Sequence, residues 1–145
     1  MRISCGIDTI RISRIQEVAD RSGSRFLERV YTPAEREACE AKGVGCIPSL
    51  AARFAAKEAV SKALGTGIGK EGVSFCDIEV IIISGGKPEI RFHGRSLEYF
   101  KSIGGIQAEL SMSHDGDQAM AVCVMQFDER LENCFEDSKD TGGFR

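Results

Sequence analysis

The chain has 145 residues, of which 42% are hydrophobic and 28% are charged, and its net charge is −3. These values are typical of one globular domain, and no window approaches the roughly 18 apolar residues that a membrane-spanning helix needs. The N-terminus also lacks the apolar core of a signal peptide, so we expect a cytoplasmic protein without a membrane partner.

Charge and cysteine usage exclude two further classes of function. Residues 1–62 carry 11 Lys/Arg and 8 Asp/Glu, whereas residues 63–145 carry 8 and 14. The small excess of basic residues in the first half of the chain can steer an acidic partner. Nucleic-acid binding typically needs a strongly basic domain, so we expect no nucleic-acid partner. The six cysteines form no Cys-x-x-Cys pair and no zinc-ligand spacing, which predicts free thiols rather than a zinc site.

The start of the chain predicts a strand that leads into a helix. A run rich in Ile and Cys predicts the strand over residues 2–10. Ser13 is a suitable N-cap for a helix over residues 14–22, and Gly23 is suited to end that helix.

The next elements are two helices, followed by a mixture of strands and a helix. A capping box, Thr32-Pro33-Ala34-Glu35, opens a helix that runs to about Lys42. An alanine-rich helix follows over residues 47–64, and Gly65–Gly69 break it. Two strands follow, over 77–84 and 89–93, on either side of a turn at Gly85–Pro88. A helix over 95–103 comes next. The last two strands, over 109–114 and 119–127, flank a hairpin turn at Asp115-Gly116.

This order of elements predicts an α+β fold. We expect a single domain over residues 1–127, with a small antiparallel sheet packed on one long helix and shorter helices. Residues 128–145 are acidic and lack a strong period, and we expect them to form a partly disordered C-terminal tail.

The long helix carries an unusual set of charges. Glu58 lies among three cations, Arg53, Lys57 and Lys62, and Phe54, Glu58 and Lys62 share one stripe at i, i+4 and i+8. Charges on a packed helix cost free energy unless something compensates them. A metal ion and a phosphate-rich substrate would compensate both signs; the alternative is a simple i, i+4 ion pair between Glu58 and Lys62.

Asp8 is the second candidate carboxylate. It follows Gly6 in the first strand, where aspartate is uncommon, although it could also cap a turn at the strand end. Asp8 and Glu58 together could supply two carboxylates to one Mg²⁺, which favours sites completed by substrate phosphates and water. Lys62, one turn beyond Glu58, would then reach a phosphate oxygen.

The other polar motifs are less specific. The glycines of 65–69 match neither a Walker A loop nor Gly-x-Gly-x-x-Gly, and they could simply end the helix. Ser113, His114 and Asp115 are adjacent and therefore cannot form a hydrolase relay. His114 is either a ligand contact or a turn histidine, and we expect His93 to be a histidine without a catalytic role.

Six segments in this order carry a resemblance that covers about residues 3–127. They are Gly6-Ile7-Asp8, Arg53–Ala63, Gly65-Thr66-Gly67-Ile68-Gly69, Asp77-Ile78-Glu79, Gly86-Lys87-Pro88 and Ser113-His114. The chain closely resembles the short type of 4′-phosphopantetheinyl transferase, the holo-acyl-carrier-protein synthases. Fold and site residues are expected to follow that family.

The resemblance implies a reaction and an assembly. The phosphopantetheine arm of coenzyme A is moved to a serine of an acidic apo acyl carrier protein, 3′,5′-ADP is released, and the active sites lie between the subunits of a homotrimer. Asp8 and Glu58 correspond to the Mg²⁺ ligands, and Lys62 corresponds to the cation on the pyrophosphate; these three are the catalytic candidates. The base that accepts the serine proton would be Glu58 or a metal-bound water.

The resemblance also implies two sets of binding residues. The coenzyme A contacts would be Arg53, Lys62, Gly65, Thr66, Pro88 and His114, some of them donated by the neighbouring subunit. The carrier-protein contacts would be Arg14, Arg21 and Arg25. Residues 43–49 depart from the family pattern because they lack the cation expected to grip the 3′-phosphate.

Two other functions fit the same residues. A Mg²⁺-dependent nucleotide pyrophosphohydrolase would use the acid pair and the lysine but would need no basic docking helix. A non-catalytic trimer would bind coenzyme A without Mg²⁺-dependent turnover.

Overall fold

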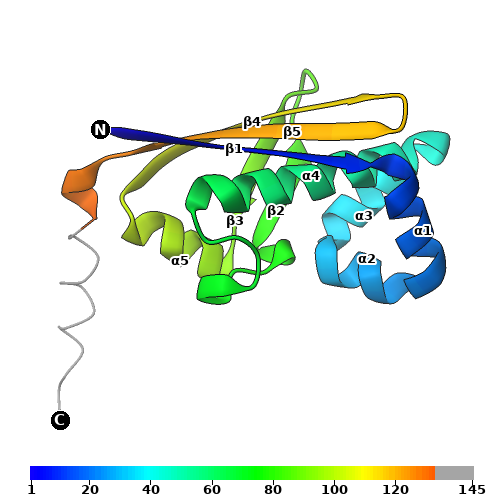
Figure 1. The fold of residues 1–145 in the computed structure, drawn as a ribbon, viewed down its shortest axis with the longest axis horizontal. Helices are drawn as coiled ribbons and strands as arrows, with labels where there is room; N and C mark the ends of the chain where they lie inside the picture. The colour runs from blue at the N-terminus through cyan, green and yellow to red at the C-terminus, as the bar shows by residue number, and fades with distance from the viewer. Residues whose placement is uncertain (133–145) are drawn as a thin grey trace, which may run out of the picture.

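The computed structural model describes residues 1–132. In chain order the elements are β1 (Arg2–Arg11), α1 (Ile12–Ser22), α2 (Ser24–Val30), α3 (Pro33–Glu40), α4 (Cys46–Leu64), β2 (Ile78–Ile82), β3 (Pro88–Phe92), α5 (Gly94–Ser102), β4 (Gly105–Asp115) and β5 (Gln118–Phe127). A sheet of β1, β5 and β4 lies along α4, while α1, α2 and α3 gather at one end of α4 and α5 at the other (Figure 1). The β2–β3 hairpin forms a second, two-stranded sheet.

The three-stranded sheet has one face in the core and one face open. All its pairs are antiparallel, and β1 pairs with β5 from Arg2 opposite Phe127 to Arg11 opposite Gln118. Alternate residues of β5 are buried against the core: Ala119, Ala121, Cys123, Met125 and Phe127. The residues between them point to the other face, where, among the described residues, only the tip of the β2–β3 hairpin reaches past the sheet in Figure 1.

Helix α4 is buried almost all round. Between Ser49 and Leu64, only Phe54, Glu58 and Lys62 are not fully buried. Their i, i+4 and i+8 spacing puts them on one stripe, as the sequence predicts. The helix therefore offers solvent a single narrow line of side chains, and that line contains two of the three catalytic candidates.

Strand β1 lies directly on α4 because Gly6 has no side chain. A Cβ at Gly6 would overlap the Ala59 carbonyl oxygen and would lie 2.8 Å from the Ala63 nitrogen. Beside it, the Ser4 hydroxyl donates a 2.7 Å hydrogen bond to the Ala63 carbonyl. This close approach brings Asp8 to the exposed stripe of α4.

The structure corrects several predicted local features. Ser13 is not a cap, because α1 begins at Ile12 and Ser13 lies inside its first turn. Helix α2 was not predicted, since seven residues are too few for a clear period. The capping box of Thr32 and Glu35 is confirmed, and α3 ends at Glu40 rather than near Lys42.

The end of the described chain bears on the predicted tail. Asp128 donates its backbone N–H to the Gly104 carbonyl, and a 3₁₀ turn spans Glu129–Leu131. The rest of the predicted tail, residues 133–145, lies outside the described residues, and the domain boundary at 127 stays a prediction. In residues 1–132 the five cysteines are free, and no helix there is long and apolar enough to cross a membrane.

Candidate active site

The three catalytic candidates meet where β1 crosses α4. The Lys62 ammonium lies 3.1 Å from Asp8 Oδ1 and donates a 2.8 Å hydrogen bond to the Ile7 carbonyl. Burial raises the pKa of Glu58, the nearby Asp8 carboxylate raises it further, and Lys62 lowers it. The structure therefore brings together two carboxylates that repel each other and one cation.

This donor set fits a divalent cation. Asp8 and Glu58 are only partly exposed, and a bound cation would offset the repulsion that raises the pKa of Glu58. Among residues 1–132, no group of three or more His, Cys, Asp or Glu side chains could hold a metal. The chain would thus supply two carboxylates, and substrate phosphates and water would complete the shell, as Mg²⁺ prefers.

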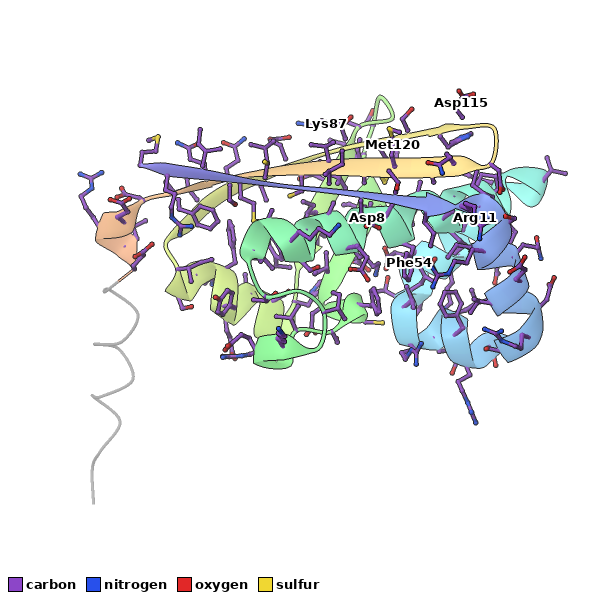
Figure 2. All side chains as sticks on the ribbon, in the orientation of Figure 1. Asp8, Arg11, Phe54, Lys87, Asp115 and Met120 are labelled. Carbon is purple, nitrogen blue, oxygen red and sulfur yellow. The ribbon has the colours of Figure 1, made fainter. Side chains whose placement is uncertain are left out.

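A cavity of about 500 Å³ opens beside the acid pair. Three aromatic rings line it: Phe54 lies 5.3 Å from Phe75 and 6.4 Å from Phe26 between ring centroids. In Figure 2, Asp8 and Phe54 lie between β1 and helices α1 and α2. The cavity combines an acidic end, apolar walls and the basic side chains described next, and it can accept a long, partly apolar substrate arm.

Two of the three predicted carrier-protein contacts line this cavity. Arg14 and Arg21 on α1 contribute to its wall, whereas Arg25 is exposed on α2 and is not among the lining residues. Arg29, which was not among the predicted contacts, also lines it. The missed signal was the apolar pair Phe26 and Val30, whose i, i+4 spacing could have revealed α2 and with it the position of Arg29.

A second cavity, of about 300 Å³, contains Arg53 and His114. Lys42 and Ser113 line it as well, and none of its lining residues is acidic, so its charge suits an anion. Arg53 is only 2% exposed; its Nη1 donates to the Ser49 hydroxyl, and its Nε has no hydrogen-bond partner in the described chain. Two predicted coenzyme A contacts thus meet in a cavity that does not contain the acid pair.

The other predicted coenzyme A contacts are spread over the chain. Gly65 ends α4 with a φ of 86°, which favours glycine, and Thr66 is buried with its hydroxyl donating to the Gly67 carbonyl. Pro88 begins β3 next to Lys87, which Figure 2 shows near the tip of the β2–β3 hairpin, beyond the open side of the sheet. Gly65 lies at the end of α4, where its N–H donates to the carbonyl of Lys62, whereas Pro88 is on the hairpin and does not line the cavity beside the acid pair.

The structure corrects the interpretation of Lys57. Its ammonium is completely buried and donates to Glu35 Oε1 at 2.6 Å and to the carbonyls of Val30 and Phe75 at 2.7 and 3.0 Å. Burial lowers the pKa of Lys57, and the Glu35 carboxylate opposes that shift. The charge of Lys57 is therefore compensated inside the protein, and no substrate phosphate is needed for it.

His93 contacts Glu79. Its Nε2 lies 3.1 Å from Glu79 Oε1, and the Thr32 hydroxyl donates to the other oxygen of Glu79 at 2.6 Å. The hydrogen bond from Thr32, followed by that from His93, holds the pKa of Glu79 below its usual range. None of these three residues lines the cavity beside the acid pair.

Comparison with known proteins identifies the family of this chain. A sequence profile of the 4′-phosphopantetheinyl transferase superfamily matches residues 4–123, which sets the class of protein. The holo-[acyl-carrier-protein] synthase of Carboxydothermus hydrogenoformans is 47% identical over 122 residues, which cover 84% of this chain and 96% of that protein. The holo-[acyl-carrier-protein] synthase of Ruminiclostridium cellulolyticum is 41% identical over 133 residues, which cover 92% of this chain and 98% of that protein. The chain therefore belongs to the holo-[acyl-carrier-protein] synthase family of this superfamily.

Solved structures of the family share the fold. The holo-[acyl-carrier-protein] synthase of Neisseria meningitidis superimposes with a TM-score of 0.78 at 33% identity, covering 85% of this chain and 97% of that one. The Helicobacter pylori enzyme, solved in complex with coenzyme A, gives a TM-score of 0.74 at 38% identity and coverages of 84% and 99%. The α+β fold predicted from the sequence is confirmed.

Proposed function

We propose that this protein transfers the 4′-phosphopantetheine group of coenzyme A to a serine of an apo acyl carrier protein, releasing 3′,5′-ADP, in a Mg²⁺-dependent step of fatty acid biosynthesis. The cluster of Asp8, Glu58 and Lys62 carries this proposal, because its two carboxylates line a cavity that basic side chains also line. Relatives named holo-[acyl-carrier-protein] synthase, and a neighbour in complex with coenzyme A, support the two substrates.

The side chains suit a displacement at phosphorus. The serine oxygen forms a new bond to the β-phosphorus, the bond from that phosphorus to the ADP oxygen breaks, and the serine proton passes to a base. The proton acceptor would be Glu58 or a metal-bound water, and Lys62 offers a fixed positive charge to the pyrophosphate. Mg²⁺ held by Asp8 and Glu58 would neutralise charge on the pyrophosphate and on the departing oxygen.

The mass of the carrier protein tests the reaction directly. Purified protein, apo carrier protein and coenzyme A are incubated with Mg²⁺ or with EDTA, and the intact carrier is weighed. We expect the mass of one phosphopantetheine group to be added with Mg²⁺ and none with EDTA. Release of nucleotide with no change in carrier mass would instead support a nucleotide pyrophosphohydrolase, and coenzyme A binding without turnover would support a non-catalytic binding protein.

Arg14 and Arg21 are expected to govern recognition of the acidic carrier. Arg14→Glu and Arg21→Glu should each raise the KM for carrier protein about tenfold at low salt and leave the KM for coenzyme A unchanged, because charges at an interface mainly act on association. Steady-state kinetics at two salt concentrations measure this, with Lys101→Glu on the exposed side of α5 as the control. A carrier KM that stays at the wild-type value in low salt would remove both arginines from the docking surface.

We propose that the active enzyme is a homotrimer with sites between subunits. The open face of the sheet bears exposed apolar side chains: Ile3, Ile7, Met120, Val122 and Val124. Exposed apolar patches of this kind mark protein interfaces. The assembly would also explain why Pro88 and His114 lie away from the acid pair of their own chain.

Light scattering tests the assembly. The wild-type protein is expected at three times the chain mass of 15.8 kDa. Val122→Lys places a charge at the centre of the open face and should lower the mass and the transfer rate together, whereas Val44→Lys, at an exposed valine elsewhere, should keep the wild-type mass. A wild-type monomer with full activity would contradict the trimer.

The cytoplasmic location predicted from the sequence stays a prediction.

A further inference from the structure

We infer that Asp117, in the turn between β4 and β5, is a positioning residue that holds the carrier-docking helix α1 in place. This inference rests on the proposed function, because it concerns the affinity for the carrier protein. Asp117 is not among the residues that line either cavity, so it would act through α1 and not through contact with a substrate.

Three hydrogen bonds join Asp117 to the first turn of α1. Asp117 Oδ1 accepts from the Ser13 backbone N–H at 2.8 Å, and Oδ2 accepts from the Ser13 hydroxyl at 2.6 Å. The Asp117 carbonyl accepts from the Ile12 N–H at 2.8 Å. The bonds from Ser13 hold the pKa of the Asp117 carboxyl below its usual range, so this carboxyl is ionised near neutral pH.

Helix α1 has no cap of its own. Its N-cap residue, Arg11, makes no side-chain capping bond, and its first turn contains no acidic residue. That turn carries Arg14, whose charge is unfavourable next to the positive end of the helix dipole. Asp117 therefore supplies from a distant turn both the acceptors and the negative charge that helices usually obtain from nearby residues.

The position of α1 depends on this contact. Strand β1 ends at Arg11 and α1 begins at Ile12, so no loop residue separates them. Arg11 pairs with Gln118 at the last rung of the sheet, directly beside the turn that holds Asp117. The turn thus sets the direction in which α1 leaves the sheet, and with it the placement of Arg14 and Arg21 on the cavity wall.

The test compares Asp117→Ala and Ser13→Ala with the control Asp115→Ala. Asp115 lies in the same hairpin, and its exposed side chain makes no hydrogen bond to any of residues 1–132. Loss of a helix cap typically corresponds to a factor of about five in an equilibrium. We expect Asp117→Ala to raise the KM for carrier protein about fivefold, with the KM for coenzyme A and the kcat at saturating carrier within about twofold of wild type.

A second readout does not depend on activity. Hydrogen exchange of the backbone amides of α1 should be faster in Asp117→Ala and in Ser13→Ala, and unchanged in Asp115→Ala. The double variant of Ser13 and Asp117 should be no worse than Asp117→Ala alone, because Asp117→Ala already removes the one hydrogen bond, from the Ser13 hydroxyl, that Ser13→Ala removes.

Two results would overturn the inference. One is wild-type exchange of α1 and a wild-type carrier KM in Asp117→Ala; the other is an equal effect of Asp115→Ala, which would point to the turn as a whole. If the wild-type protein transfers nothing, the proposed function fails, and the exchange of α1 alone then decides whether Asp117 caps the helix.

Discussion

Asp8→Asn or Glu58→Gln is expected to lower the rate of carrier modification on the order of 10³-fold. Each change removes one of the two carboxylates that would hold Mg²⁺, and metal stabilisation of transition-state charge is typically worth several kcal/mol. The measurement is the initial rate of mass gain by the carrier at saturating coenzyme A and Mg²⁺. Near-normal turnover in either variant would remove that residue from the metal site.

The same two variants should fold normally. The pair between Lys62 and Asp8 is partly exposed, and such pairs contribute about 0–1 kcal/mol to stability. Removing either carboxylate also relieves the repulsion between the two. Melting temperatures at or slightly above the wild-type value are therefore expected, and Glu37→Gln, on the exposed side of α3, is the control for loss of a carboxylate elsewhere.

Lys57→Met should have the largest effect on stability. It leaves the Glu35 carboxylate buried without its cation and removes the donor to the carbonyls of Val30 and Phe75. Breaking a buried ion pair typically costs about 3–5 kcal/mol, a large part of the roughly 5–15 kcal/mol by which domains are stable. Urea unfolding measures the change.

Lys62→Met is the matched control, since it removes the same group from the exposed stripe of the same helix. It should cost less than about 1 kcal/mol of stability while lowering activity. If Lys57→Met does not fold, the double variant Lys57→Met/Glu35→Leu should recover folded protein, because neither charge of this pair then remains buried. A loss below about 1 kcal/mol in Lys57→Met would show that the pair does not support the fold.

What could be predicted from the sequence depended on how local each contact is. The stripe of Phe54, Glu58 and Lys62 follows from helical spacing alone, and the structure confirms it. The meeting of Asp8 with Lys62 joins segments 54 residues apart. The residues alone left a shared site as one of several alternatives, and the family resemblance favoured it. Gly6 makes that meeting possible, but the need for a glycine there is visible only once β1 lies on α4.

The errors have the same origin. Lys57 was counted among the cations that a phosphate-rich substrate would compensate, because its actual partner, Glu35, lies 22 residues away on another helix. Ser13 was interpreted as a cap because Ser is a favoured N-cap residue, whereas its actual partner, Asp117, is 104 residues distant. Short-range patterns identify helices and strands well, but they contain no information about which side chains meet after folding.

The single open stripe of α4 limits how this gene product can change in length. Each residue of an α-helix advances the side-chain direction by about 100°. One inserted or deleted residue between Leu50 and Phe54 would rotate the stripe of Phe54, Glu58 and Lys62 relative to the part of the helix before it. Either the charged side chains would then turn into the core, or the alanine-rich face would turn out to solvent. Length variation should therefore be tolerated only outside this helix, for example in the 3₁₀ turns at Gly43–Gly45 and Lys70–Gly72.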